Sequence, residues 1–246
     1  MLDFGFYNDD CMKIMAQLPD KSIDLAIVDP PYGIGYDKAV SKTGGTQYGK
    51  SAAKKTTYHT ADWDNSIPDE AYFDELFRVS KNQIIWGGNY FTEYLPPSKG
   101  WIVWDKRCNE KFNNDFADCE LAWTNMGVAR VFRYLYNGMI VENMANKEYR
   151  IHPTQKPIDL YIWLLNHYAK EGWTILDTHV GSASSLIACH KAGLKYIGCE
   201  LDPVYYEKAK ERLENETSQV TLFDLMGGKR NKAEEIDNQT TLADFL

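Results

Sequence analysis

The sequence predicts an α/β fold with a mostly parallel sheet and helices on both of its faces. In the C-terminal half, short apolar runs alternate with segments whose apolar residues recur at helical spacing. In the N-terminal half, the apolar run at residues 23–28 (IDLAIV) has the length of a buried strand and stops at two prolines. No internal repeat is visible, and 246 residues suffice for one large domain.

The individual elements follow from these patterns in chain order. After the strand at 23–28, the residues Tyr72, Phe73, Leu76 and Phe77 share one face of a helix expected over 68–80. Further strands are expected at 83–86, 101–104, 120–124 and 128–135, with a turn at 125–127 between the last two. Pro157 can open a helix that reaches residue 168. The remaining alternation gives a strand at 173–176, a helix at 183–192, a strand at 196–199 and a helix at 203–215.

Composition excludes several protein classes. The apolar fraction of 44 % and the charged fraction of 25 % are average for a globular chain, so disorder, collagen and coiled coil are excluded. No apolar run approaches the roughly 18 residues that span a bilayer, and residues 1–10 lack the pattern of a secretion signal. Five cysteines without a C-x-x-C pair indicate a reducing cytoplasm and no zinc ribbon. No ligand cluster has metal-site spacing, so no metal dependence is expected.

The net charge of −8 at first argues against a nucleic-acid partner, but the charge is segregated. Residues 38–61 contain five lysines and no acidic residue, so the other 222 residues carry −13. The surrounding segment 33–61 is rich in Gly, Ser and Thr and too long for an ordinary connection. This segment is either functional or a solvated, flexible loop. From about Asn215 the chain becomes polar and loses its periodicity, which predicts a tail over 215–246.

The first chemical signal is the turn Asp29-Pro30-Pro31-Tyr32 at the carboxyl end of the strand at 23–28. Ligands of open α/β sheets bind outside the carboxyl ends of strands, which favours a site at this turn. Two prolines stiffen the turn and hold an acid beside an aromatic ring. The alternative is a strand-terminating turn with an exposed tyrosine.

A second signal is the small-residue turn at 177–184 (DTHVGSAS), between a strand and the start of a helix. Such a turn brings backbone N–H groups close to a ligand. Glu200 ends the next strand, where a carboxylate can accept hydrogen bonds from both ribose hydroxyls of an adenosyl group. Ala183 suits this turn if its φ is negative. The alternative is an ordinary βαβ unit with Glu200 facing solvent. His179 either packs over the ligand or simply enters the helix, and the second interpretation is favoured.

The third signal is the loop at 152–157 (HPTQKP), which lies just before a helix. Its two prolines and its amide, hydroxyl and ammonium groups suit a small polar ligand. Alone, the loop would also fit a rigid helix cap.

Taken together and in this order, D-P-P-Y, H-P-T-Q-K-P and D-x-x-x-G-S resemble the S-adenosylmethionine-dependent DNA amino-methyltransferases that act on adenine N6 or cytosine N4. The order, with D-P-P-Y before the cofactor turn, resembles the circularly permuted β group, found in phages and restriction–modification systems. The matches are dense at 7–37 and 149–214. The resemblance implies a Rossmann-like, seven-stranded, circularly permuted methyltransferase domain over 1–214. The family turn commonly reads D-P-F-x-G-S-G, so Thr178, His179 and Ala183 are departures.

The resemblance also implies roles for single residues. The catalytic turn would be Asp29, Pro30, Pro31 and Tyr32, with Asp29 and the Pro30 carbonyl accepting from the target amine and Tyr32 stacking on the flipped base. The expected residues of the S-adenosyl-L-methionine site are Asp10, Cys11, Asp29, Thr154, Lys156, Asp177, Thr178, Gly181, Ser182, Glu200 and Asp202. Thr154 and Lys156 would line its methionine end. Asp at the first motif position favours adenine N6 over cytosine N4.

DNA is the expected partner. The loop at 33–62 would track phosphates through Lys38, Lys42, Lys50, Lys54 and Lys55, with Tyr48, Tyr58 and His59 near bases. Lys106 and Arg107, with Lys111, Arg130 and Arg133, form a second candidate surface inside an expected recognition region at 105–150. In the tail, 219–223 (QVTLF) resembles a peptide that docks on the replication sliding clamp, although chance or packing on the domain explains it equally well. A homodimer would help so small a protein surround DNA.

The leading hypothesis from the sequence is therefore a DNA adenine-N6 methyltransferase. Cytosine-N4 methylation is the close rival, and RNA methylation is a more distant one. A catalytically silent nucleic-acid-binding protein with the same fold is a further alternative, which the altered cofactor turn favours and the intact D-P-P-Y opposes.

Overall fold

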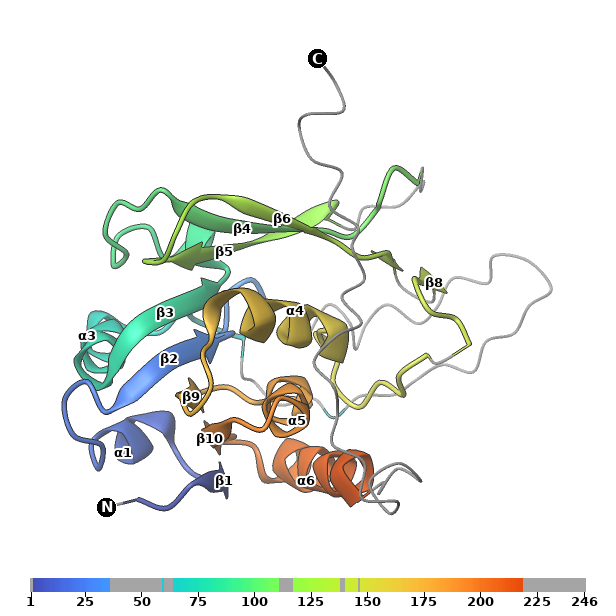
Figure 1. Cartoon of the computed structure of the whole chain (residues 1–246). Helices are drawn as coiled ribbons and strands as arrows, with labels where there is room; N and C mark the ends of the chain where they lie inside the picture. The colour runs from blue at the N-terminus through green and yellow to red at the C-terminus, as the bar shows by residue number, and fades with distance from the viewer. Residues whose placement is uncertain are drawn as a thin grey trace.

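The computed structural model describes residues 2–35, 59, 64–110, 117–137, 140–145 and 147–218. These residues form an eight-stranded sheet in the order β1-β10-β9-β2-β3-β5-β4-β6 (Figure 1). Its strands are β1 (Gly5–Tyr7), β2 (Ile23–Val28), β3 (Ser80–Trp86), β4 (Gly100–Asp105), β5 (Cys119–Thr124), β6 (Arg130–Arg133), β9 (Thr174–Asp177) and β10 (Lys195–Cys199). A separate ribbon pairs β7 (Tyr136–Asn137) with β8 (Ile140–Val141).

The sheet is mostly parallel, as predicted. Strands β1, β10, β9, β2 and β3 pair in parallel, and β5 is antiparallel to both β3 and β4. The sheet has one strand more than the seven expected, because β6 pairs in parallel with β4 at the edge. The turn at 125–127 therefore does not close a hairpin between β5 and β6. The reversal of β5 brings its first residues beside the carboxyl ends of its neighbours.

Helices cover both faces of the sheet, which confirms the predicted architecture (Figure 1). One face carries α4 (Ile158–Tyr168), α5 (Ser184–Lys191) and α6 (Pro203–Ser218), and the other carries α1 (Cys11–Met15) and α3 (Glu70–Val79). Strand β2 is apolar except for Asp24, because both faces of the sheet are covered at this strand. Leu25 and Ile27 belong to one hydrophobic core, and Ala26 and Val28 belong to the other.

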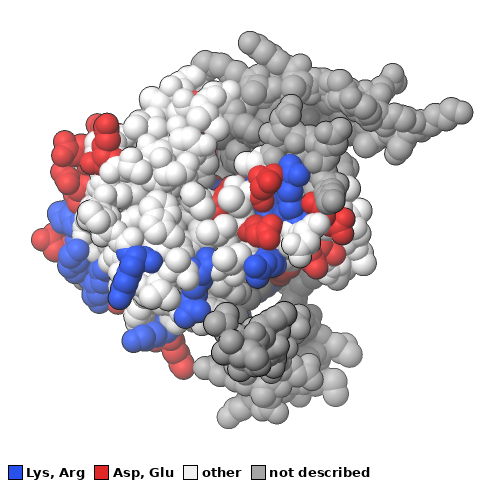
Figure 2. Space-filling model, turned by 90° about the horizontal axis from the view of Figure 1, so that it is seen from above, with Lys and Arg blue, Asp and Glu red and all other residues white. Residues whose placement is uncertain are grey.

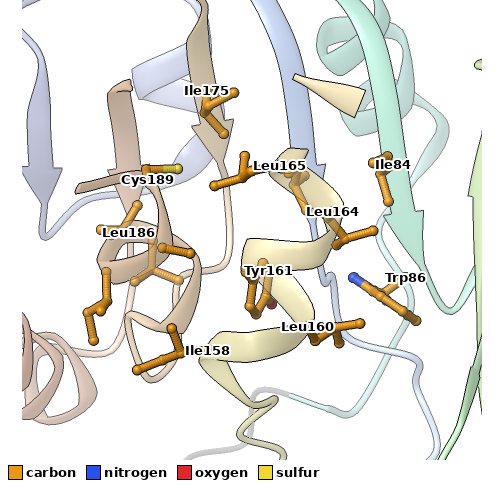
Figure 3. Close-up of a cluster of buried hydrophobic side chains, with 14 of the residues drawn as sticks. Ile84, Trp86, Ile158, Leu160, Tyr161, Leu164, Leu165, Ile175, Leu186 and Cys189 are labelled. Atoms are coloured by element: carbon orange, nitrogen blue, oxygen red, sulfur yellow. The ribbon is translucent and has the colours of Figure 1, made fainter. Parts of the chain in front are cut away.

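The larger core lies between α4, α5 and the middle of the sheet (Figure 3). From α4, Leu160, Leu164 and Leu165 lie among Ile84 and Trp86 of β3 and further residues of β9 and α5, all nearly inaccessible to solvent. This packing places the loop before α4 against the ends of β2 and β3, where the predicted site residues lie.

Most expected elements occur within a few residues of their predicted bounds. The helix expected over 68–80 is α3, and Ser80 already belongs to β3. The strand β1, the helix α1, the short 3-10 helix η1 (Gly88–Tyr90) and the ribbon of β7 and β8 were not predicted, because two to five residues carry too little periodicity. Helix α6 continues to Ser218, beyond the expected end at 215. The clamp-like segment 219–223 lies outside the described residues.

Among the described residues, no helix combines the length and the apolar character that crossing a bilayer requires.

Replacement of Leu164 by alanine should lower the free energy of unfolding by about 2–5 kcal/mol, because it leaves a cavity in a closely packed core. Urea unfolding monitored by tryptophan fluorescence measures the change. Asn166→Ala, at an exposed position of the same helix, is the matched control and should change stability little. Equal effects of the two variants would contradict this view of the core.

Candidate active site

Polar side chains follow the carboxyl ends of three parallel strands and gather at one edge of the sheet. Asp29 follows β2, Glu200 follows β10 and the acidic turn Asn8–Asp10 follows β1. Gly87, which has no side chain, follows β3 at the same edge. The first residues of the reversed strand β5 reach the same edge, and with them Glu120. This is the edge at which ligands bind in open α/β sheets.

Two cavities open at this edge, with volumes of about 500 and 570 Å³. We call the smaller one the Tyr32 cavity and the larger one the Glu200 cavity. They share one wall, and both volumes suit an organic ligand. The shared wall consists of Asp29, Pro31, Thr154, Gln155 and Lys156.

The Glu200 cavity brings together almost all the residues that the sequence predicts for the cofactor. Those that line it are Asp10, Cys11, Asp29, Thr154, Lys156, Thr178, Gly181, Ser182, Glu200 and Asp202. The exception is Asp177, which does not line the cavity and is 2 % exposed. Sequence reasoning did not assign His152, His179 and Tyr205, which also line this cavity.

Glu200 is held in place by the backbone at this cavity. Its carboxylate accepts hydrogen bonds from the backbone N–H of Gly181 at 2.9 Å and of Asp202 at 3.0 Å. Burial raises the pKa of Glu200 despite these two donors. Asp202 in turn caps α6, accepting from the N–H groups of Val204 and Tyr205. The carboxylate predicted to hold a ribose is thus fixed by the glycine turn and does not simply face solvent.

Two residues of the turn after β9 have features that the sequence did not predict. Ala183 has a φ of +64°, so the condition of a negative φ is not met, and a left-handed alanine costs about 1–2 kcal/mol. His179 lines the Glu200 cavity, where burial lowers its pKa to about 4, so the ring is neutral at pH 7. Its Nδ1 lies 2.9 Å from the Thr178 hydroxyl, which also bonds Tyr72 at 2.7 Å. His179 was interpreted as a helix-entry residue, and the structure places its ring in the lining of the Glu200 cavity.

Asp177 is buried beneath this turn and bonds two of its neighbours. Its carboxylate accepts a hydrogen bond from the Ser185 hydroxyl and another from the His179 backbone N–H at 3.0 Å. Burial raises the pKa of Asp177 to about 7, and the carboxylates of Asp29 and Glu200 add to this rise.

The Tyr32 cavity contains all four residues of the predicted catalytic turn, Asp29, Pro30, Pro31 and Tyr32. The Tyr32 hydroxyl donates to Asp29 Oδ1 at 2.7 Å, which fixes the ring and the carboxylate relative to each other. The Tyr32 ring stacks on Tyr90 with centroids 4.9 Å apart and planes 15° apart. Tyr90 lies in η1, directly after β3, and its side chain is 43 % exposed. The sequence did not predict that this ring lines the cavity.

Gly87 makes room for this ring. Its φ is +70°, and a Cβ atom at this position would lie 2.1 Å from Cε1 of Tyr32. Gly33, directly after Tyr32, has a φ of +69° and donates its N–H to Asp64 Oδ1 at 2.8 Å. The absence of a side chain at Gly87 therefore permits the placement of the ring, and the bond to Asp64 fixes the backbone directly after Tyr32.

Lys156 connects the loop at 152–157 to the catalytic turn. Its Nζ lies 2.5 Å from Asp29 Oδ2 and 3.2 Å from Glu120 Oε2, and its side chain is 4 % exposed. Burial alone would lower the pKa of Lys156, but Asp29 and Glu120 outweigh burial and raise it. Lys156 was expected at the methionine end of the cofactor. The structure adds that it lies on the shared wall and bonds the Asp29 carboxylate directly.

The candidate DNA contacts are only partly within the described residues. The five lysines Lys38, Lys42, Lys50, Lys54 and Lys55, together with Tyr48, Tyr58 and Lys111, lie outside them. Lys106 is turned inward: its Nζ lies 2.9 Å from Glu120 Oε1 and its side chain is 15 % exposed. Arg107 pairs with Asp118 at 2.5 Å. Both residues therefore already have carboxylate partners. His59 lies 3.2 Å from Asp202, near the Glu200 cavity.

Charged side chains are unevenly distributed on the surface. On the face shown in Figure 2, charged side chains of both signs surround a broad uncharged area.

Comparisons with known proteins agree with this geometry. A family model described as DNA methylase matches residues 103–211. The methylase YubD of Escherichia coli is 24 % identical over 228 residues, covering 85 % of this chain and 89 % of its own. The type II methyltransferase M.HpaI of Haemophilus parainfluenzae is 28 % identical over 246 residues, covering 84 % and 73 %.

Solved structures confirm the fold. A DNA modification methylase of Thermus thermophilus superimposes with a TM-score of 0.55 at 17 % identity, covering 88 % of this chain and 97 % of its own. The complex of M1.HpyAVI with SAM superimposes with a TM-score of 0.52 at 18 % identity, covering 85 % of this chain and 100 % of its own. The cytosine-N4-specific PvuII DNA methyltransferase superimposes with a TM-score of 0.52 at 13 % identity, covering 87 % of this chain and 95 % of its own.

The raised pKa of Asp177 makes stability depend on pH. The unfolded carboxyl titrates near 3.8 and the folded one near 7, so its contribution is complete below the lower value and is lost as pH rises through the higher one. Asp177→Asn cannot ionise. Its stability relative to wild type should therefore rise by about 2–3 kcal/mol between pH 5 and pH 8.

Urea unfolding at several pH values measures this difference. Asp118→Asn, a carboxylate that is 71 % exposed, controls for the loss of charge. A difference in stability between the wild type and Asp177→Asn that stays constant with pH would contradict the titration of Asp177 in this range.

Proposed function

Because this chain belongs to the N6/N4 family of S-adenosylmethionine-dependent DNA methyltransferases, we propose that it methylates the N6 amine of adenine in a base flipped out of the duplex. The observation that carries the proposal is the wall shared by the two cavities. Asp29 lies on this wall, so a donor in the Glu200 cavity and a base in the Tyr32 cavity would meet at one carboxylate.

The residues of the Glu200 cavity fit S-adenosylmethionine. The cavity of about 570 Å³ combines the Glu200 carboxylate with the acidic turn at Asp9 and Asp10 and with the neutral ring of His179. Carboxylates suit ribose hydroxyls and an amino group, and a neutral ring suits a purine. When bound, S-adenosylmethionine supplies an activated methyl group.

Asp29 and the Pro30 carbonyl prepare the amine for transfer. The amine lone pair of adenine is delocalised into the ring, and acceptors on its N–H bonds localise the lone pair. Asp29 already accepts one hydrogen bond at each oxygen, from Tyr32 and from Lys156. Because two carboxylate oxygens offer about four acceptor sites, Asp29 can accept from the base as well.

In this mechanism Tyr32 positions the base, and the Asp29 carboxylate stabilises the positive charge that develops on the amine. The hydroxyl bond to Asp29 and the contact with Gly87 hold the Tyr32 ring beside the carboxylate. As the nitrogen lone pair forms the N–CH₃ bond, sulfur keeps the electron pair of the broken S–CH₃ bond and the amine becomes positive. The Asp29 carboxylate lies beside that charge and can accept the amine proton that leaves. Positioning and electrostatics therefore suffice, without a covalent nucleophile.

Adenine is preferred over cytosine because Asp, and not Ser, begins the D-P-P-Y turn. Cytosine N4 is the second candidate, since a cytosine-N4-specific enzyme shares the fold. The type II relatives point to a role in restriction–modification.

The test of this proposal is labelled S-adenosylmethionine with unmethylated duplex DNA, followed by mass spectrometry of the nucleosides. N6-methyladenine is expected. Asp29→Asn should lower kcat about 100-fold or more, because it removes the charged acceptor. Thermal unfolding of the variant shows that the fold is retained. N4-methylcytosine would replace the adenine assignment, methylated RNA alone would replace the DNA substrate, and no product with bound cofactor would overturn the proposal.

The contact between Gly87 and Tyr32 allows a more selective test. Gly87→Ala should displace the Tyr32 ring, since the new Cβ would overlap Cε1, and should lower kcat/KM for DNA about 10-fold or more. Gly127→Ala is the matched control: its φ is +62° and nothing lies within 4 Å of the added Cβ. Both variants carry the same backbone strain, so only their difference reports on Tyr32. Similar activity of the two would show that the ring position does not matter.

A further inference from the structure

Glu120 is a charged residue of the Tyr32 cavity to which neither the sequence motifs nor the proposed mechanism gives a role. It is the second residue of β5, far in sequence from both D-P-P-Y and the loop at 152–157. The antiparallel direction of β5 brings it to the carboxyl ends of the parallel strands. Its carboxylate is 27 % exposed and lies in the wall of the cavity.

Each oxygen of Glu120 holds a different lysine. Oε2 lies 3.2 Å from Lys156 Nζ, and Oε1 lies 2.9 Å from Lys106 Nζ. Burial alone would raise the pKa of Glu120, but the two ammonium groups outweigh burial and hold it below its usual value. Glu120 is therefore charged at neutral pH.

The result is a row of four charges that alternate in sign: Asp29, Lys156, Glu120 and Lys106. We call these residues the charge row. Its members come from the end of β2, from the loop before α4, from β5 and from the end of β4. The Lys156 ammonium also lies 5.4 Å from the ring centroid of Trp86 and 5.9 Å from that of Tyr32. Two rings and two carboxylates thus define where this ammonium sits.

We propose that Glu120 is a positioning residue of the methyl-transfer site, acting on Asp29 through the ammonium of Lys156. The effect on catalysis rests on the proposed function, whereas the contacts between Glu120, Lys156 and Asp29 are those of the charge row. An ammonium has three donors, and Glu120 takes one of them away from Asp29. Without Glu120, Lys156 can approach both oxygens of Asp29 and occupy acceptor sites that the base amine needs.

A substitution series separates charge from position. Glu120→Gln keeps an oxygen that can accept from Lys156, whereas Glu120→Met keeps the length of the side chain and removes the acceptor. We expect kcat to fall about 10- to 100-fold in Glu120→Met and only a few-fold in Glu120→Gln. KM for DNA and for S-adenosylmethionine should stay within about 3-fold, because the residue acts on the reacting carboxylate and not on binding. Asp118→Asn, two residues earlier and paired with Arg107 outside the cavity, is the matched control and should leave kcat unchanged.

A second readout does not depend on activity. Nitrogen-detected NMR of lysine ammonium groups should give a slowly exchanging signal for Lys156, assigned by its loss in Lys156→Arg. That signal should persist in Asp118→Asn and in Glu120→Gln, and should shift or broaden in Glu120→Met. If the wild-type protein methylates no nucleic acid, the proposed function fails while this measurement still tests the charge row.

Two outcomes would overturn the inference. One is a Glu120→Met variant with kcat within 2-fold of wild type or with an unchanged Lys156 signal. The other is a loss of kcat matched by an equal loss of cofactor affinity or of thermal stability in both Glu120 variants, which would make Glu120 merely structural.

Discussion

The ion pair between Lys156 and Asp29 is the contact on which the arrangement of both cavities depends. It joins the loop before α4 to the end of β2, across 127 residues of sequence. A buried ammonium is costly unless it is paired, and losing one partner of such a pair typically costs about 3–5 kcal/mol. The pair therefore specifies where the loop at 152–157 must lie. Because both partners of this pair belong to the wall shared by the two cavities, the shapes of the cavities follow from the same contact.

A second buried pair holds this loop from the other side. Glu148 accepts from Arg212 Nη2 at 2.6 Å and from the backbone N–H of Ile158, the first residue of α4, at 2.8 Å. Arg212 also donates to the carbonyl and the hydroxyl of two serines in the turn after β9, Ser182 and Ser184. One guanidinium thus ties the loop and the glycine turn together. Donors in a fixed fork suit this task, which an ammonium with a single charge centre would do less well.

The sequence predicted those residues of the site whose position follows from the strand that directly precedes them. Asp29, Tyr32 and Glu200 each follow an apolar run, so strand periodicity alone places them at one edge of a parallel sheet. Glu120 could not be found in this way, because its position depends on β5 running against its neighbours, and direction leaves no trace in a six-residue strand. Tyr90 lies in a single 3-10 turn and was missed for a similar reason. The left-handed φ of Ala183 could not be predicted from the sequence, because the fold imposes it although an alanine side chain disfavours it.

The charge row also resolves an apparent contradiction in the site. In the proposed mechanism the Asp29 carboxylate accepts hydrogen bonds from a base and faces a developing positive charge, and an adjacent lysine weakens both interactions. Yet a buried carboxylate without a cationic partner tends to take up a proton, as burial does to Asp177 behind this wall. Lys156 supplies the cationic partner to Asp29, and Glu120 shares the attraction of that lysine, so that the charge of Asp29 is not fully neutralised. Lys106 completes the row and makes it electrically neutral, which limits the cost of burying four charges together. The cavity can therefore hold a strong acceptor at a fixed position without carrying a net charge of its own.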